Sequence, residues 1–126
     1  MYNKLLGIAG IFGLLAVAIG AFGAHGLKDV LLPSEKAVFE TANRYHFYHT
    51  IMLVLVAILY ARDESRMLRL AAFAFIDGIV LFSGSLYLIA TKNILGISTW
   101  AFLGPITPVG GLFFIVGWFV LACAHA

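Results

Sequence analysis

The chain has little charge and almost no cysteine. Only 11% of its 126 residues are charged, against about 25% in typical soluble domains. The formal net charge is +2 and no run of basic residues concentrates it, so we expect no nucleic-acid partner. The single cysteine, Cys123, excludes an internal disulfide and a cysteine-rich metal site. We therefore predict no cofactor and no metal.

Apolar side chains take the place of the missing charge. Hydrophobic residues make up 63% of the chain, and the mean hydropathy is +1.03. A soluble domain of this size has too much surface for its volume to bury so many apolar groups. The first partner of this chain is therefore predicted to be the lipid bilayer.

Four apolar segments cover about residues 5–24, 45–61, 67–90 and 100–124. Each approaches the roughly 20 residues that a helix needs to cross a bilayer, and none alternates with period two as a membrane β-strand does. Lys4 and the run after it resemble a signal peptide, but the run continues to Ala24 and indicates a retained helix. The sequence predicts an all-α integral membrane protein: one domain, 1–126, with four transmembrane helices in an antiparallel bundle.

Two boundaries stay open at this point. Residues 27–44 form either a separate interfacial helix or the start of the second span, which then begins near Ser34; the absence of Gly and Pro from 34–61 favours the second alternative. In the fourth span, either Pro105 and Pro108 kink the helix, or Thr107 caps a helix whose first residue is Pro108.

Four spans place both termini on the same side of the membrane. Four cations fall on each side, but three arginines, Arg62, Arg66 and Arg69, gather at one short loop. By the positive-inside rule this favours cytoplasmic termini.

The first span carries a face of small residues. Gly13, Gly20 and Gly23 lie on it, and small residues let helix backbones approach closely in lipid. We predict that these glycines pack against a neighbouring helix.

Polar groups gather in one half of the bilayer. His25 ends the first span, and His46 and His49 begin the second; antiparallel threading brings these ends to one membrane face. Three imidazoles there favour either a transition-metal or haem ligand set or simple solvation near the headgroups. The alternating direction of the spans brings the end of the third span and the start of the fourth to the same half of the bilayer. We therefore predict a polar vestibule formed by His25, His49, Ser83, Ser85, Tyr87, Thr107 and Pro108.

Asp77 is the one acidic residue near the middle of a span. Ionisable groups at that depth carry a high free energy of burial and often mark ion or proton pathways. The alternative is a neutral acid that hydrogen-bonds to a neighbouring helix.

Four stretches, "GAFGAHGL" (20–27), "YHFYHT" (45–50), "LFSGSLY" (81–87) and "WAFLGPITPVGG" (100–111), resemble the domain of unknown function 423 family of small bacterial inner-membrane proteins. The resemblance covers nearly the whole chain in the same order. It implies a four-helix protein of the bacterial plasma membrane, and it implies no activity. His46 stands where relatives often have glutamine, which weakens a triple-histidine metal site, and Asp77 lies outside these stretches.

No nucleophile–base pair, paired carboxylates or phosphate-binding loop is present in the pattern, which argues against an enzyme. We predict a non-enzymatic binding or accessory component whose polar vestibule meets a lipid, a small molecule or a membrane partner. One alternative is an oligomeric transporter or channel for small solutes or ions that uses Asp77. Another is a redox component that binds haem, metal or quinone at His25 and His49.

Overall fold

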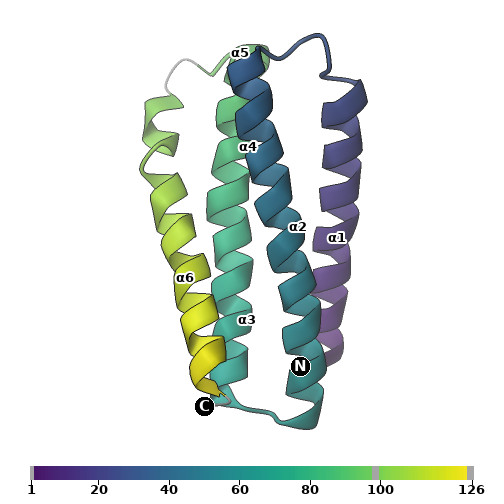
Figure 1. The fold of residues 1–126 in the computed structure, drawn as a ribbon, viewed down its shortest axis with the longest axis vertical. Coiled ribbons are helices and arrows are strands. Elements are labelled where there is room, and N and C mark those ends of the chain that lie inside the picture. The colour runs from purple at the N-terminus through teal and green to yellow at the C-terminus, as the bar shows by residue number, and fades with distance from the viewer. Residues whose placement is uncertain (1, 98–99, 125–126) are drawn as a thin grey trace.

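The computed structural model describes residues 2–97 and 100–124. Four long helical spans run side by side, and the two ends of the chain lie at the same end of the molecule (Figure 1). All four spans are long and apolar enough to cross a membrane. The predicted all-α architecture with four membrane-spanning helices is confirmed.

The elements, in chain order, are α1 (Tyr2–His25), α2 (Pro33–Arg62), α3 (Arg66–Gly78), the π-helix η1 (Ile79–Ser83), α4 (Gly84–Ala90), α5 (Lys92–Leu95), the 3₁₀ helix η2 (Trp100–Leu103) and α6 (Ile106–Ala124). The third span is continuous through α3, η1 and α4.

A single helix contains the whole second span, so residues 34–44 form no separate interfacial helix. Its start is fixed by Pro33 in the first turn and by Glu35, whose carboxylate accepts a hydrogen bond of 2.9 Å from the Leu32 N–H. Leu32 is therefore the residue that precedes the helix. Glu35 also accepts from the Asn93 amide at 2.9 Å, which ties the start of α2 to α5.

The fourth span is broken near its start. Residues Trp100–Leu103 form the 3₁₀ turn η2, and α6 begins at Ile106, after Pro105. Thr107 does not cap this helix, because its hydroxyl donates back to the Leu103 carbonyl at 3.4 Å. Gly104 and Pro105 thus separate a short turn from the main helix of this span.

The four spans form a row in which α2 and the third span are central. α1 packs mainly along α2, α2 packs along α3, η1 and α4, and α6 packs mainly along α3 and η1 (Figure 1). α1 and α6 consequently bury less of their surface than the two central spans. The outer faces of α1 and α6 are left for lipid.

Two apolar clusters lie at different levels of the row. The larger one includes Leu53, Leu68 and Phe75, and the smaller one joins Leu31, Phe39 and Ala90 near α5. A separate set of buried residues is polar. Apart from Glu35, these are His46, His49, Thr50, Ser83 and Ser85.

Candidate functional site

A partly buried hydrogen-bond network joins α1, α2 and α4. The Asn43 side-chain amide donates to the Ala16 carbonyl at 2.9 Å and to the Tyr87 hydroxyl at 3.0 Å. The Tyr87 oxygen lies 2.9 Å from Nδ1 of His46. Because lipid offers no hydrogen bonds, such contacts satisfy polar groups that would otherwise be exposed to hydrocarbon.

His46 shares a hydrogen bond with Tyr87 and lies against α1. Tyr87 accepts from Asn43, and the tautomer of the imidazole decides whether the Tyr87 hydroxyl or Nδ1 of His46 donates in the bond between them. His46 is 4% exposed, and its Nε2 meets no hydrogen-bond partner in the described part of the chain. The edge of this ring contacts Phe12 of α1, with ring centroids 6.2 Å apart.

Two serines connect the third span to its neighbours. Ser83, the last residue of η1, donates to the Ala42 carbonyl of α2 at 2.7 Å. Ser85 and Thr107 share a hydrogen bond of 2.6 Å between α4 and the start of α6. A π-helical segment shifts the register of a helix, and such segments are frequent at functional sites. Here η1 lies where the third span contacts both α2 and α6.

His49 contacts α3 and α6, whereas His46, one turn earlier on α2, contacts α1 and α4. The Trp118 indole donates to Nε2 of His49 at 3.1 Å, and Nδ1 of His49 lies 2.8 Å from the Tyr45 carbonyl, to which it donates. The ring stacks on Phe114, with centroids 3.6 Å apart and planes 9° apart. Both nitrogens of His49 are therefore engaged, and the aromatic contacts fix the ring.

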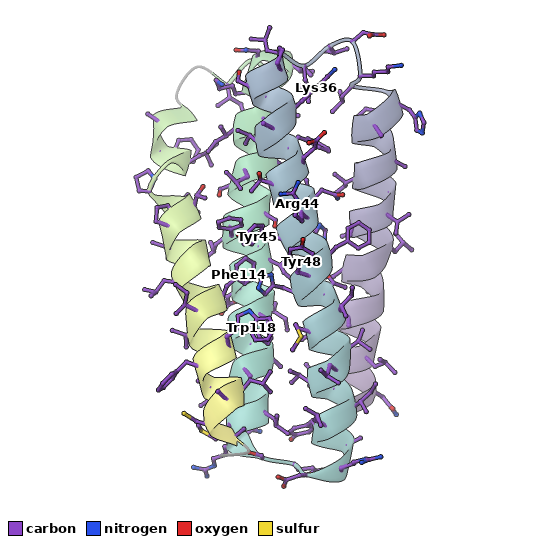
Figure 2. All side chains as sticks on the ribbon, in the orientation of Figure 1. Lys36, Arg44, Tyr45, Tyr48, Phe114 and Trp118 are labelled. Atoms are coloured by element: carbon purple, nitrogen blue, oxygen red, sulfur yellow. The ribbon has the colours of Figure 1, made fainter. Side chains whose placement is uncertain are left out.

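An open groove of about 850 Å³ lies between α2 and α6, with η1 beside it. We call it the α2–α6 groove. Figure 2 shows Tyr45 and Tyr48 on α2 with Phe114 and Trp118 at the facing side of α6. The remaining wall is aliphatic or aromatic apart from His49. The groove is lined by Tyr45, Tyr48, His49, Ile51, Met52, Phe82, Pro108, Gly111, Leu112, Phe114, Ile115 and Trp118.

The predicted vestibule residues fall into separate places. His49 and Pro108 line the α2–α6 groove, Ser85 is bonded to Thr107, and Tyr87 belongs to the network with Asn43 and His46. His25 is exposed at the end of α1. The structure thus does not bring His25, His46 and His49 together, because each faces different neighbours.

Asp77 lies on the outer face of α3. It is exposed, and no hydrogen bond or ion pair engages its carboxylate among residues 2–97 and 100–124. The exposed apolar residues Leu70, Phe73 and Val80 of the same span share this exposure to lipid. The neighbouring helices of the same chain therefore supply no donor to Asp77.

The small-residue face of α1 receives side chains of α2. A methyl group on Gly13 would lie 3.6 Å from Thr50, one on Gly20 would lie 2.7 Å from the Asn43 amide oxygen, and one on Gly23 would overlap the Phe39 ring. Gly7 and Gly10 have nothing within 4 Å. Only the second half of the glycine face therefore packs tightly.

Sequence inspection missed the residues that organise these sites. Asn43 was not singled out, although an amide just before an apolar run is a candidate for an interhelical hydrogen bond. Phe114 was not singled out either, because an aromatic residue in an apolar helix carries no distinguishing signal. Its importance comes from stacking on His49.

Comparison with known proteins identifies the class of this chain. Residues 19–111 match the family described as protein of unknown function, DUF423. The match covers well over half of the chain, so the chain belongs to the DUF423 family. This confirms the resemblance of the four sequence stretches.

Relatives from several bacteria cover most of the chain. A UPF0382 membrane protein of Haemophilus influenzae is 39% identical over 97% of this chain and 93% of its own length. The UPF0382 membrane protein YwdK of Bacillus subtilis is 39% identical over 93% of this chain and 91% of its own length. The UPF0382 inner membrane protein YgdD of Escherichia coli is 37% identical over 90% and 82%, respectively. No solved structure matches the chain. The chain is thus a small integral membrane protein.

Proposed function

We propose that this chain is a non-enzymatic binding protein of the membrane, and that the α2–α6 groove holds an apolar molecule with a hydrogen-bond-accepting group. The size and lining of the groove carry the proposal. The volume of the groove, about 850 Å³, falls in the range of small-molecule sites, which are mostly apolar with a few polar groups. All lining residues belong to the membrane spans, so the occupant enters from the bilayer.

Two tyrosines supply the polar contact. Tyr45 is 37% exposed and Tyr48 is 53% exposed, and in the part of the chain that is described neither hydroxyl has a hydrogen-bond partner. A phenol in that position donates to an ester or ketone oxygen. The expected ligand therefore combines an apolar chain or ring with a carbonyl oxygen, as in an acylglycerol or a quinone.

His49 supports the wall of the groove and performs no chemistry in this proposal. Its two nitrogens bond Trp118 and the Tyr45 carbonyl, so it has no free lone pair for a metal or a substrate proton. The hydrogen bond from Trp118 to His49 fixes the position of the indole beside Phe75. A rigid aromatic wall binds with a smaller loss of conformational entropy.

The proposal is tested with a variant in which a larger side chain fills the groove. The molecules that copurify with this variant, with a control variant and with the wild-type chain are then compared. A first side-chain carbon at Gly111 would lie 3.7 Å from the Phe82 ring, an ordinary contact, so Gly111→Leu keeps the helix packing and projects the rest of its side chain into the groove. Gly7→Leu adds the same volume to α1, where nothing lies within 4 Å. Each protein is purified in mild detergent and its native mass spectrum is recorded.

We expect an added mass on the wild-type chain and on Gly7→Leu, and none on Gly111→Leu. Circular dichroism checks that both variants remain helical. Extraction and mass analysis of the ligand then identify its class. Equal retention by Gly111→Leu, or a bare wild-type chain, would contradict the proposal.

A second candidate function, an oligomeric transporter of small solutes or ions, rests on Asp77. A carboxyl group in the apolar part of a span is costly to leave in lipid, and only another chain is placed to cover the outer face of α3. Flux into proteoliposomes that stops in Asp77→Asn would favour this candidate. Flux that is absent, or unaffected by Asp77→Asn, would count against it.

We also propose that the chain lies in the bacterial inner membrane with both termini in the cytoplasm. Arg62, Arg66 and Arg69 are exposed at the end of the row that carries the termini. Their concentration at one short loop supports a cytoplasmic location for that end. Reporter fusions to the C-terminus test this: a cytoplasm-active reporter such as a fluorescent protein is expected to function, and alkaline phosphatase to stay inactive. The opposite pattern would reverse the orientation.

A further inference from the structure

A second cleft, of about 470 Å³, opens between the end of α1 and the first half of α2. We call it the α1–α2 cleft. Its base is apolar and includes Gly20, Gly23, Leu31 and Phe39, while its rim carries three cations, Lys28, Lys36 and Arg44. Figure 2 shows Lys36 and Arg44 on α2, with Lys36 nearer the end that carries α5.

The cations of this cleft are not neutralised by the chain itself. Lys28, Lys36 and Arg44 form no ion pair within 4.0 Å among residues 2–97 and 100–124. The ion pair described, 4.0 Å between Lys92 and Glu35, uses none of them. Glu40 is the one carboxylate that lines the cleft. Three cations against one carboxylate leave an excess of two positive charges.

The cleft lies where the membrane meets water. Arg44 immediately precedes the apolar run 45–61, and the apolar run of α1 ends at Ala24. The apolar base therefore extends towards the hydrocarbon, while the long side chains of Lys28 and Lys36 reach the headgroup level. An occupant that matches both parts has an anionic head and an apolar body.

We propose that the α1–α2 cleft binds the phosphate group of an anionic membrane lipid. A phosphate diester accepts several hydrogen bonds at once, from the planar guanidinium of Arg44 and from the ammonium groups of the two lysines. Basic pockets between membrane helices bind phosphate-bearing headgroups in this way. Glu40 offers an acceptor for a headgroup hydroxyl, which suits a glycerol headgroup.

The glycines of α1 explain why the cleft exists. Gly20 and Gly23 leave the α1 backbone bare, so that Asn43 and Phe39 of α2 lie directly against it. Larger residues would fill the cleft base or push the helices apart. The cleft is separate from the α2–α6 groove, because α2 presents a different face to each, and this proposal goes beyond the function proposed above.

The experiment measures lipid preference with matched charge variants. The full chain in mild detergent is incubated with equal amounts of phosphatidylglycerol and phosphatidylcholine of identical acyl chains, and native mass spectrometry gives the ratio of the bound forms. The test variant is Lys28→Gln/Lys36→Gln/Arg44→Gln. The control, Arg62→Gln/Arg66→Gln/Arg69→Gln, removes the same charge from exposed residues at the other end of the row.

We expect the wild-type chain and the control to prefer phosphatidylglycerol by at least tenfold and the test variant to show little preference. Each cation near an anionic headgroup is worth roughly a fivefold change in affinity, so the three together approach roughly a hundredfold. The single variant Lys36→Gln is expected to lose about fivefold. Because all three residues are at least partly exposed, the variants are expected to fold.

Three outcomes would overturn the proposal. The first is no preference for phosphatidylglycerol in the wild-type chain, and the second is an equal loss in the control triple variant, which would indicate a general surface effect. The third is displacement of the lipid by millimolar inorganic phosphate, which would identify free phosphate as the ligand. Retention of the preference in Gly111→Leu separates this cleft from the α2–α6 groove.

Discussion

The α1–α2 interface and the α3–α6 interface both depend on glycine, but the groups that the glycines admit are different. On α1, Gly13 gives room to the Thr50 methyl group, Gly20 to the Asn43 amide and Gly23 to the Phe39 ring. Between α3 and α6, Gly78 gives room to the Phe114 ring and Gly117 to the Phe75 ring. The first interface thus admits an amide as well as apolar groups, and the second admits rings at both glycines.

This difference has a physical reason. In lipid, apolar contact alone gives little preference for one helix over another, so association depends on close packing and interhelical hydrogen bonds. The α1–α2 interface uses hydrogen bonds such as the one from Asn43 to the Ala16 carbonyl. The α3–α6 interface uses shape. Orientation in the first is set by donor and acceptor positions, and in the second by which glycine receives which ring.

The largest expected effect is at Gly110, where α6 meets the backbone of η1. A methyl group there would lie 2.7 Å from the Cα of Phe82 and close to its backbone nitrogen, and backbone cannot move aside as a side chain can. Gly110→Ala is expected to lower the free energy of unfolding by about 3 kcal/mol. Unfolding in sodium dodecyl sulfate, followed by circular dichroism, measures it.

The adjacent glycine is the control for this prediction. A methyl group on Gly111 meets only the Phe82 ring, at 3.7 Å, so Gly111→Ala is expected to change the free energy of unfolding by less than about 0.5 kcal/mol. Similar losses in the two variants would show that the close approach of α6 to the η1 backbone does not set how these elements pack.

A smaller effect is expected when the polar network is broken. Tyr87→Phe removes the hydroxyl that bonds Asn43 and His46 and leaves both polar groups short of a partner in a buried site. We expect a loss of about 1.5 kcal/mol in the free energy of unfolding, measured in the same titration. Tyr60→Phe, at a buried tyrosine with no hydrogen bond in the described part of the chain, serves as control. Equal losses would mean that the hydrogen bonds of the Tyr87 hydroxyl add nothing to the free energy of unfolding.

The smallest effect is expected at Gly23, where the obstacle is a side chain. A methyl group there would press on the Phe39 ring, which can rotate away, so Gly23→Ala is expected to lose only about 1 kcal/mol. Gly10→Ala, with nothing within 4 Å, is expected to gain about 0.5 kcal/mol because alanine favours a helix over glycine. A gain of the same size at Gly23 would show that α1 does not pack tightly on α2 at this level.

Several features of the fold were accessible from the sequence. The apolar runs predicted four spans, because a bilayer requires a minimum length of apolar helix. The alternating direction of the spans placed Ser85 and Thr107 in the same half of the bilayer, and these residues share a hydrogen bond. The two prolines left open whether the fourth helix was kinked or started at Thr107, and α6 starts one residue earlier, at Ile106.

The sequence by itself determined the spans, the shared side of the termini and the concentration of polar groups in one half of the molecule, because these depend only on helix length and chain direction. Only the tertiary structure decided that His46 meets Tyr87, that His49 meets Trp118 and that His25 meets neither. Those pairings depend on the rotation of each helix about its axis. That rotation is fixed by where glycine lets a neighbouring side chain or backbone approach, and hydropathy along a single chain carries no record of it.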